Sequence, residues 1–176
     1  GTCTTYGRVA YCGQDPWILN ADLRQNIILF GATPQVVDEK RYSATLHACC
    51  LLPDVAQMPA GDRTEIGEKG VTLSGGQKAR LALARAIYSN ADLYLLDDPL
   101  SSVDASVAKQ LKKRLFGNEG MLRQKAVVIV THQLHILPIV DRVLVMSKGC
   151  ISHDGPFQVL LDSGVDFGRL LLGQMK

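Results

Sequence analysis

Short apolar runs punctuate the chain, and each one ends at a polar or turn residue. Such runs span residues 91–98, 125–132 and 142–149, and a further one spans residues 8–12. Runs of about five apolar residues with polar boundaries are typical of parallel strands that are covered on both faces. We therefore predict four buried strands at these positions.

Between these runs the apolar positions follow a helical period. Residues 77–89 predict an amphipathic helix, with Lys78, Arg85 and Ser89 on its polar side. Its apolar stripe consists of Ala79, Ala82, Leu83, Ala86 and Ile87. We expect the stripe to face the strands and the polar side to face water.

Two more helices have recognisable first residues. Asp104 is a suitable N-cap for a helix whose buried stripe is Val107, Leu111 and Leu115. Pro156 suits the first position of a helix that ends at Gly164.

Strands that alternate with helices predict an α/β domain with a mainly parallel sheet. Residues 35–68 interrupt the alternation, because they contain no strand-like run and carry apolar residues at helical spacing. We predict that they form a helical insertion. A chain of 176 residues suggests a single domain.

Composition and charge exclude several classes of protein. The apolar fraction is 47%, the charged fraction is 20% and the net charge is +2, so bulk electrostatics gives no case for a nucleic-acid partner. The five cysteines form no C-x-x-C pair, which favours reduced thiols over a zinc site or a disulfide framework. No apolar run approaches the roughly 20 residues that cross a bilayer, and no leader peptide is visible.

Two carboxylates end the strand predicted at residues 91–98. Parallel sheets bind ligands beyond the carboxyl ends of their strands, and Asp97 and Asp98 lie at such an end. Adjacent carboxylates repel each other unless a cation or polar ligand is near, and Mg²⁺ prefers such hard oxygen ligands. The alternative is a strand-terminating turn helped by Pro99.

Two other polar residues follow predicted strands. His132 ends the strand at residues 125–132, where it can donate toward a phosphate or toward an attacking water, or else cap the next helix. Gln14 follows the first strand, and its uncharged amide can touch a metal or a water without holding it permanently.

The stretch Leu-Ser-Gly-Gly-Gln at residues 73–77 stands directly before the predicted helix. Adjacent glycines destabilise a helix interior by roughly 1 kcal/mol each relative to alanine, whereas at a helix entrance they let N–H groups approach a ligand. One interpretation is a loop that becomes a helix with Ser74 as its N-cap. The other is a cradle for a phosphate.

Together these motifs resemble the nucleotide-binding domain of ATP-binding cassette (ABC) transporters. LSGGQ resembles the signature motif of that family, DLYLLDD at 92–98 its Walker B strand, and SSVD at 101–104 its D-loop. Gln14 is similar to the Q-loop glutamine and His132 to the switch histidine. The segments 15–31, 47–77 and 97–107 resemble the C subfamily, the multidrug-resistance-associated proteins, and within it the first of two such domains.

The resemblance implies a P-loop NTPase-like fold, with a mainly parallel sheet and a helical subdomain that carries the signature motif. Residues 1–176 would be a partial domain, with the helical subdomain at about 35–85 and the ATP-binding core at 1–34 and 86–176. The Walker A string G-x-x-x-x-G-K-[ST] does not occur in the chain, so we expect a portion that starts after it. We expect this portion alone to lack measurable ATP binding and ATPase activity.

The same resemblance implies ATP and Mg²⁺ as cofactors. In the family two domains pair head to tail, so that the signature of one contacts the nucleotide held by the other. The residues implied in nucleotide binding are Ser74, Gly75, Gly76, Gln77 and Asp104. Asp97 and Gln14 are implied as metal ligands, and Asp98, His132 and Gln14 as catalytic residues.

Asp98 departs from the family pattern. The family usually has a glutamate here, which orients the attacking water. Aspartate is one methylene shorter, so its carboxylate falls roughly 1.5 Å short. Misplacement by about 1 Å can cost on the order of 100-fold in rate, so we expect slow turnover at this chain's own site.

The implied function is to couple ATP binding and hydrolysis to export across a membrane. The implied partners are a second nucleotide-binding domain and the coupling helices of a transmembrane domain, contacted through the Gln14 region and residues 64–70. The domain would lie on the cytoplasmic face, as part of an integral membrane protein. Alternatives are a non-hydrolytic regulatory module, a channel-type or receptor-regulating member, and a soluble ABC ATPase of DNA repair, which would need a long coiled coil that this chain lacks.

Overall fold

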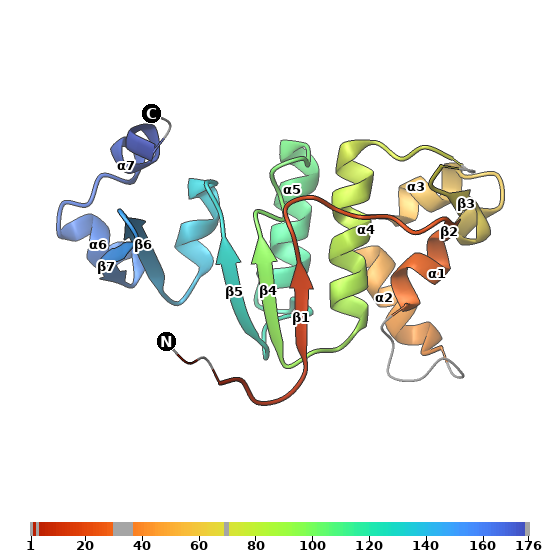
Figure 1. Cartoon of the computed structure of the whole chain (residues 1–176), viewed down its shortest axis with the longest axis horizontal. Helices are drawn as coiled ribbons and strands as arrows, with labels where there is room; N and C mark the ends of the chain where they lie inside the picture. The colour runs from red at the N-terminus through yellow and green to blue at the C-terminus, as the bar shows by residue number, and fades with distance from the viewer. Residues whose placement is uncertain (1, 3, 30–36, 69–70, 175–176) are drawn as a thin grey trace. The chain divides into compact units, whose positions relative to one another are not determined.

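The computed structural model describes residues 2, 4–29, 37–68 and 71–174. The chain divides into two compact units, Gly1–Val130 and Thr131–Lys176, and each unit has a sheet of its own (Figure 1). None of the described helices is long and apolar enough to cross a bilayer.

The first unit is built on a three-stranded parallel sheet in the order β1-β4-β5. The strands are β1 (Val9–Cys12), β4 (Leu93–Asp97) and β5 (Ala126–Val130). Cys12 pairs with Leu96, and Leu96 pairs with Ile129, so the carboxyl ends of the strands lie level. The predicted α/β class and the parallel sheet are confirmed.

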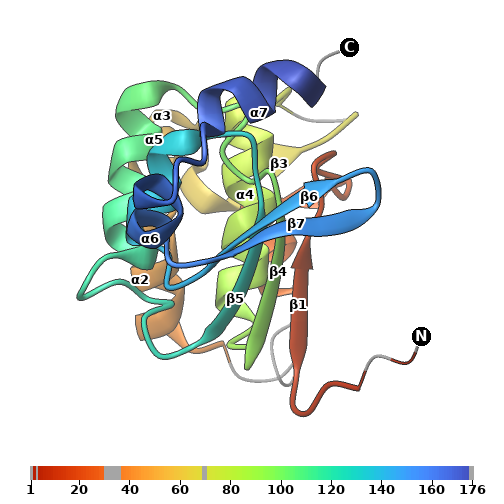
Figure 2. The same ribbon diagram turned by 90° about the vertical axis from the view of Figure 1, so that its left-hand side faces the viewer.

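Helix α4 (Gly75–Tyr88) is the centre of this unit. Every residue from Leu81 to Tyr88 is buried. The helix packs against β1, α1 (Leu23–Ile28) and α2 (Glu39–Ala48). Together with α5 (Ala105–Leu111) it lies on one side of the sheet (Figure 2). Because it is surrounded by strands and helices, its second half has no polar side.

The described residues cover only one face of the sheet. Ala10, Cys12, Tyr94 and Leu96 are buried on the face toward the helices. Alternate residues point the other way and stay exposed, namely Val9, Tyr11, Val128 and Val130 at 44%, 67%, 54% and 59%. The expectation of cover on both faces is therefore wrong for the described residues, since the side chains alternate but only one set is packed.

The region predicted to be a helical insertion is largely helical. It contains α2, α3 (Leu52–Gln57) and the 3₁₀ turn η1 (Gly61–Arg63). It also contains β3 (Glu65–Ile66), which pairs antiparallel with β2 (Ala21–Asp22) and corrects the expectation that no strand lies there. Strands of two residues carry no periodic signal, because their pairing depends on a distant partner.

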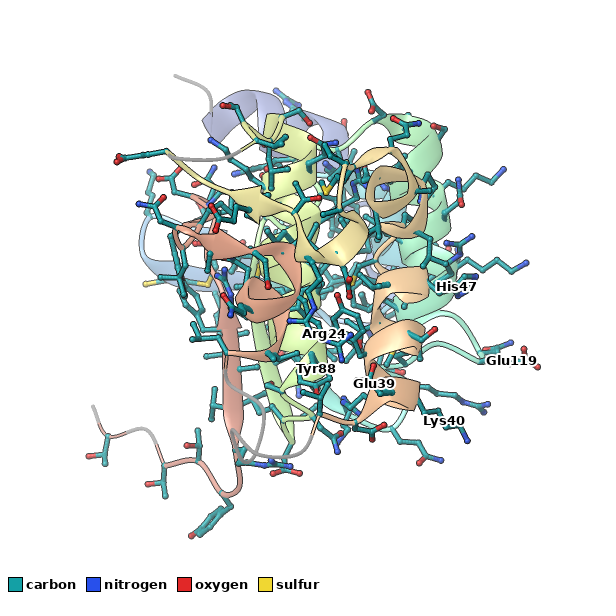
Figure 3. The ribbon with its side chains drawn as sticks, turned by 90° about the vertical axis from the view of Figure 1, so that its right-hand side faces the viewer. Arg24, Glu39, Lys40, His47, Tyr88 and Glu119 are labelled. Atoms are coloured by element: carbon teal, nitrogen blue, oxygen red, sulfur yellow. The ribbon has the colours of Figure 1, made fainter. Side chains whose placement is uncertain are left out.

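Arg24 of α1 joins the helices around α4. Its guanidinium forms ion pairs with Glu39 and, at 3.2 Å, with Asp62, and it lies 4.4 Å from the centre of the Tyr42 ring. Tyr42 packs edge-on against Tyr88 of α4. Figure 3 labels Arg24, Glu39 and Tyr88 in this region. The cation and the two rings thus tie α1, α2 and α4 together.

Helix α5 (Ala105–Leu111) follows the strand β4 and continues as the π-helical turn η2 (Lys112–Phe116). Leu111 and Leu115 are fully buried, as the predicted stripe requires. Asp104 occupies the N-cap position, but its side chain makes no capping hydrogen bond, so the predicted capping contact is wrong.

The second unit holds the hairpin of β6 (Val143–Ser147) and β7 (Cys150–Gly155). These strands pair antiparallel, which corrects the expectation of a parallel strand at 142–149. Lys148 and Gly149 both have positive φ, as a tight hairpin turn requires. The other elements are η3 (Leu134–Ile139), α6 (Phe157–Asp162) and α7 (Phe167–Gln174).

A small apolar cluster forms the core of this unit. It consists of Val143, Val145, Leu160, Val165 and Phe167. Helix α6 begins after Pro156, which is the N-cap residue and not the first helical one. It ends before Gly164, whose φ of +86° suits the end of a helix.

Removing a buried side chain from α4 should destabilise the first unit strongly. Leu83 is 0% exposed, so Leu83→Ala should lower the free energy of unfolding by about 2–5 kcal/mol. Leu52 is 43% exposed, and Leu52→Ala should cost less than about 1 kcal/mol. Urea denaturation of both variants measures the difference, and equal costs would contradict the central position of α4.

Candidate functional site

The start of α4 is the best-defined polar site in the first unit. Ser74 is the N-cap residue, and its hydroxyl oxygen accepts a hydrogen bond from the backbone N–H of Gln77 at 3.2 Å. In return the N–H of Ser74 donates to Oε1 of Gln77 at 2.9 Å. This reciprocal capping box fixes the backbone of the first turn, so the interpretation of Ser74 as an N-cap is confirmed.

The two glycines of this turn lie in different surroundings. A Cβ added to Gly75 would meet nothing within 4 Å, because Gly75 and Ser74 are exposed. A Cβ added to Gly76 would lie 2.9 Å from the carbonyl oxygen of Ser102. Gly76 is therefore needed for packing against the loop at 101–104, whereas Gly75 leaves the helix entrance open to a ligand.

The carboxyl end of the sheet carries the two aspartates. Asp97 is the last residue of β4. Asp98 has a φ of +42°, a left-handed conformation that asparagine and aspartate adopt more readily than other side chains. Its backbone N–H donates to the carbonyl of Val130 at 2.8 Å, so the turn is held to the end of β5.

Gln14 and Asp97 line one open pocket of about 640 Å³ beside β1. Cys12, Trp17 and Arg85 line it as well. The prediction that Gln14 and Asp97 belong to one site is compatible with this placement. Among the described residues no group of three or more histidine, cysteine or acidic side chains is arranged to hold a metal by itself.

Arg85 is the residue of this pocket that the helical pattern misjudged. It was expected on the polar side of the helix, but it is 4% exposed. Its guanidinium donates to the carbonyls of Asn26 at 2.7 Å and Trp17 at 3.2 Å, and to Oδ1 of Asn26 at 3.0 Å. It also stacks 3.7 Å from the centre of the Trp17 ring. The long-range carbonyl partners, which the sequence does not reveal, explain why a cation can be buried here.

Burial also changes the proton affinity of groups at this pocket. It lowers the pKa of Arg85 to about 10 and raises the pKa of Cys12 to about 11. At neutral pH the guanidinium therefore remains charged and the thiol remains protonated. The Cys12 thiol is accordingly a packing group and not a nucleophile.

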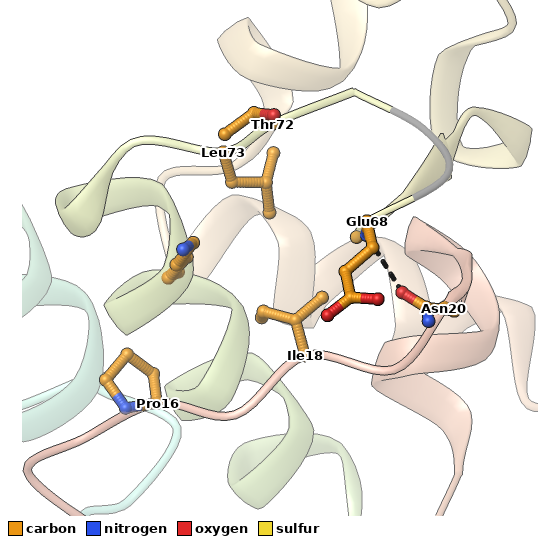
Figure 4. A pocket seen from close by; sticks show the side chains of 8 residues that line it. Pro16, Ile18, Asn20, Glu68, Thr72 and Leu73 are labelled. Carbon is orange, nitrogen blue, oxygen red and sulfur yellow. Dashed lines mark hydrogen bonds between the residues drawn. The ribbon is translucent and has the colours of Figure 1, made fainter.

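A second, smaller pocket lies beside the start of α4. It has a volume of about 400 Å³ and lies between the segment after Gln14, the loop around Glu68 and the start of α4 (Figure 4). The backbone N–H of Glu68 donates to Oδ1 of Asn20 at 2.9 Å, which joins two of its walls. Its lining residues include Pro16, Ile18, Thr72, Leu73 and Lys78.

The comparison with protein families agrees with these motifs. The family model described as "ABC transporter" matches residues 3–101, which is more than half of the chain.

This chain belongs to the ABC transporter family.

Curated members of the C subfamily resemble this ABC chain over most of its length. Multidrug resistance protein mrp-7 of Caenorhabditis elegans is 52% identical over 155 residues, which are 88% of this chain and 10% of that protein. ATP-binding cassette sub-family C member 2 of Homo sapiens is 47% identical over 171 residues, which are 97% of this chain and 11% of that protein.

ABC transporter C family member 8 of Dictyostelium discoideum is 45% identical over 172 residues, which are 97% of this chain and 10% of that protein. The chain thus spans about a tenth of the length of the relatives it matches. The predicted resemblance to the C subfamily is confirmed.

The roles of two other motif residues of the ABC chain stay predictions. His132 belongs to the second unit, where it is exposed, so its expected place at the edge near Asp97 stays a prediction. Asp104 is exposed at the start of α5, and its role toward a nucleotide likewise stays a prediction.

The two glycines offer a matched test of the packing at the signature motif. Gly76→Ala should lower the free energy of unfolding by about 1–3 kcal/mol, because its Cβ meets a backbone carbonyl that cannot move freely. Gly75→Ala should leave stability unchanged or raise it by up to about 1 kcal/mol, because the helix gains propensity and the space is open. Thermal or urea unfolding distinguishes them, and equal effects would contradict the contact with Ser102.

Proposed function

We propose that this chain is the first nucleotide-binding domain of a C-subfamily exporter, in which ATP binding and hydrolysis drive transport across a membrane. The observation that carries the proposal is the geometry of the signature motif. An exposed serine and an exposed glycine stand at the N-terminus of a 14-residue helix whose first turn is already fixed by a capping box. Two of the relatives named above are C-family members and the third is a multidrug resistance protein, which supports the assignment to an exporter.

The open helix entrance suits an anion that comes from outside the chain. Helix N-termini favour negative charge, because unpaired N–H groups and the helix dipole both point toward it. The hydroxyl of Ser74 accepts its bond from Gln77, which leaves its proton to donate to a phosphate oxygen. We assign Ser74, Gly75 and Gly76 to the terminal phosphate of an ATP carried by a partner domain, with Gln77 and Asp104 in supporting contacts.

The edge of the sheet suits the chain's own nucleotide. The carboxylate of Asp97 and the amide of Gln14 line one pocket, and both offer the hard oxygen atoms that Mg²⁺ binds together with phosphates and water. This donor set fits the ion, which when bound would neutralise charge on the phosphates. His132 would donate toward the phosphate or the attacking water.

Asp98 is assigned as the residue that orients the attacking water at this site. Its left-handed backbone is fixed by the bond to Val130, so the short side chain cannot be brought forward by a shift of the main chain. We therefore expect slow hydrolysis there. The printed sequence contains no Walker A string, so the chain by itself should show no measurable ATP binding and no hydrolysis.

The smaller pocket beside the Gln14 segment suits contact with a transmembrane domain. The residues proposed for it are the Gln14 region and residues 64–70, of which 69–70 lie outside the described residues. Apolar and polar side chains mix in this pocket, as expected for a surface that receives a short helix and transmits its movement. This assignment puts the domain on the cytoplasmic face, within an integral membrane protein, with residues 35–85 as its helical subdomain. We assign it no nucleic-acid partner.

A regulatory module that binds nucleotide without hydrolysing it is the second candidate. Asp98 favours this function for the chain's own site, since aspartate is too short to replace the usual glutamate. Under this alternative the nucleotide would hold the two domains together, and turnover would occur only at the partner's site.

Blocking the helix entrance tests the proposed function directly. In the full-length protein, Ser74→Arg should abolish most transport-linked ATP hydrolysis, because the long cationic side chain fills the place of the phosphate. The control is Ser43→Arg at an exposed position of α2, which leaves the entrance open. Transport-stimulated phosphate release measures both, and normal hydrolysis in Ser74→Arg would refute the assignment.

Lengthening the side chain at position 98 tests the slow site. Asp98→Glu in the full-length protein should raise hydrolysis at this chain's own site, because its carboxylate gains about 1.5 Å of reach. Asp98→Asn, which suits the same backbone but cannot act as a base, should not raise it. Single-site turnover with trapped nucleotide measures both, and an unchanged or lower rate in Asp98→Glu would count against the idea.

A further inference from the structure

Asp54 connects helix α3 to the signature motif. It lies in the first turn of α3, and its Oδ1 accepts hydrogen bonds from Nε2 of Gln77 at 2.9 Å and from Nη2 of Arg80 at 3.2 Å. Oδ2 of Asp54 pairs with Nη1 of Arg80. The two side chains of this ion pair are only 14% and 11% exposed, so water screens the interaction little.

The carboxylate determines which way the Gln77 amide points. A glutamine amide has an acceptor at one end and donors at the other, and nothing in its shape prevents it from turning over. Because an ionised carboxylate can only accept, Asp54 holds the NH₂ end, and Oε1 is left to accept from the N–H of Ser74. With the amide reversed, an NH₂ group would face the Ser74 N–H and the capping box would be lost.

Arg80 extends the same contact to the backbone. Its Nε donates to the carbonyl of Gly76 at 3.3 Å, and its Nη1 donates to the carbonyl of Cys50. Cys50 lies in the tight corner before α3, where its φ is +56°. The guanidinium thus joins the corner, α3 and the first turn of α4.

We propose that Asp54 is a positioning residue of the signature motif: it fixes the orientation of the Gln77 amide, and through it the place of the Ser74 backbone and hydroxyl. This inference rests on the proposed function, in which Ser74 contacts the phosphate of a nucleotide carried by the partner domain. Asp54 itself lies behind the first turn and touches Gln77 and Arg80, not the ligand.

Amide hydrogen exchange in the full-length protein tests the positioning without reference to activity. In Asp54→Asn an NH₂ donor replaces one carboxylate oxygen and faces either Nη1 of Arg80 or Nε2 of Gln77, so the three contacts of Asp54 cannot all be kept in their present geometry. Exchange of the Ser74 and Gln77 amides should become about fivefold faster or more. The matched control is Asp62→Asn, which weakens an ion pair with Arg24 at 3.2 Å in the same region but not at the signature, and should leave these two amides unchanged.

Steady-state kinetics of the same variants tests the consequence. Asp54→Asn should lower kcat for transport-stimulated hydrolysis about tenfold with KM within about twofold, because the displaced serine fails mainly where the closed site forms. Asp62→Asn should change neither constant. Asp54→Glu, which keeps an acceptor-only carboxylate, should restore the amide protection and most of kcat. Equal behaviour of Asp54→Asn and Asp62→Asn in both measurements would overturn the inference.

The variant Ser74→Arg separates this inference from the function on which it rests. Normal hydrolysis in Ser74→Arg would refute the proposed function itself. Loss of hydrolysis in Ser74→Arg, with normal kinetics and exchange in Asp54→Asn, would refute only the role of Asp54. Should Asp54→Asn not fold, Gln77→Met leaves the ion pair of Asp54 with Arg80 in place, and an unchanged kcat in that variant would likewise refute the inference.

Discussion

Helix α4 must be buried on all sides in its second half and open at its first turn. Its residues from Leu81 to Tyr88 are enclosed by β1, α1 and α2, so neither the axis nor the rotation of the helix can change without opening the core of the first unit. That constraint gives the first turn a fixed direction. A flexible loop of the same sequence would present the serine and the glycines in many orientations, and ordering them on contact with a phosphate would cost free energy.

The first turn is fixed further by groups that come from three separate places. The loop at 101–104 presses on Gly76, α3 contributes Asp54, and the corner before α3 contributes the carbonyl of Cys50. Arg85 acts similarly in the second half of α4, where it holds the segment that follows Gln14. The contacts of α4 therefore connect the signature motif with the loop at 101–104 and with the segment that follows Gln14.

The sequence predicted well whatever depends on local pattern. Apolar runs located the strands of the parallel sheet, and the position of Ser74 before a helical stripe predicted the N-cap. Features that depend on distant partners were missed. Arg85 was taken for a surface residue, because the carbonyls that bury it come from Trp17 and Asn26. One local feature was missed as well, namely the antiparallel pairing of β6 with β7, although Lys148 and Gly149 signal a tight turn. The candidate site residues were proposed from motifs and stay predictions, whereas the Asp54 contact had no motif to indicate it.

The close approach of Gly76 to Ser102 has a mechanical consequence. Because only glycine fits against that carbonyl, the loop at 101–104 and the first turn of α4 pack in direct contact. A displacement of the loop by more than a few tenths of an ångström toward the helix must push the serine with it. Under the proposed function, a movement at the end of β4, from which this loop emerges, would therefore shift the serine that contacts the phosphate held by the partner domain, and so would link the two sites of the pair.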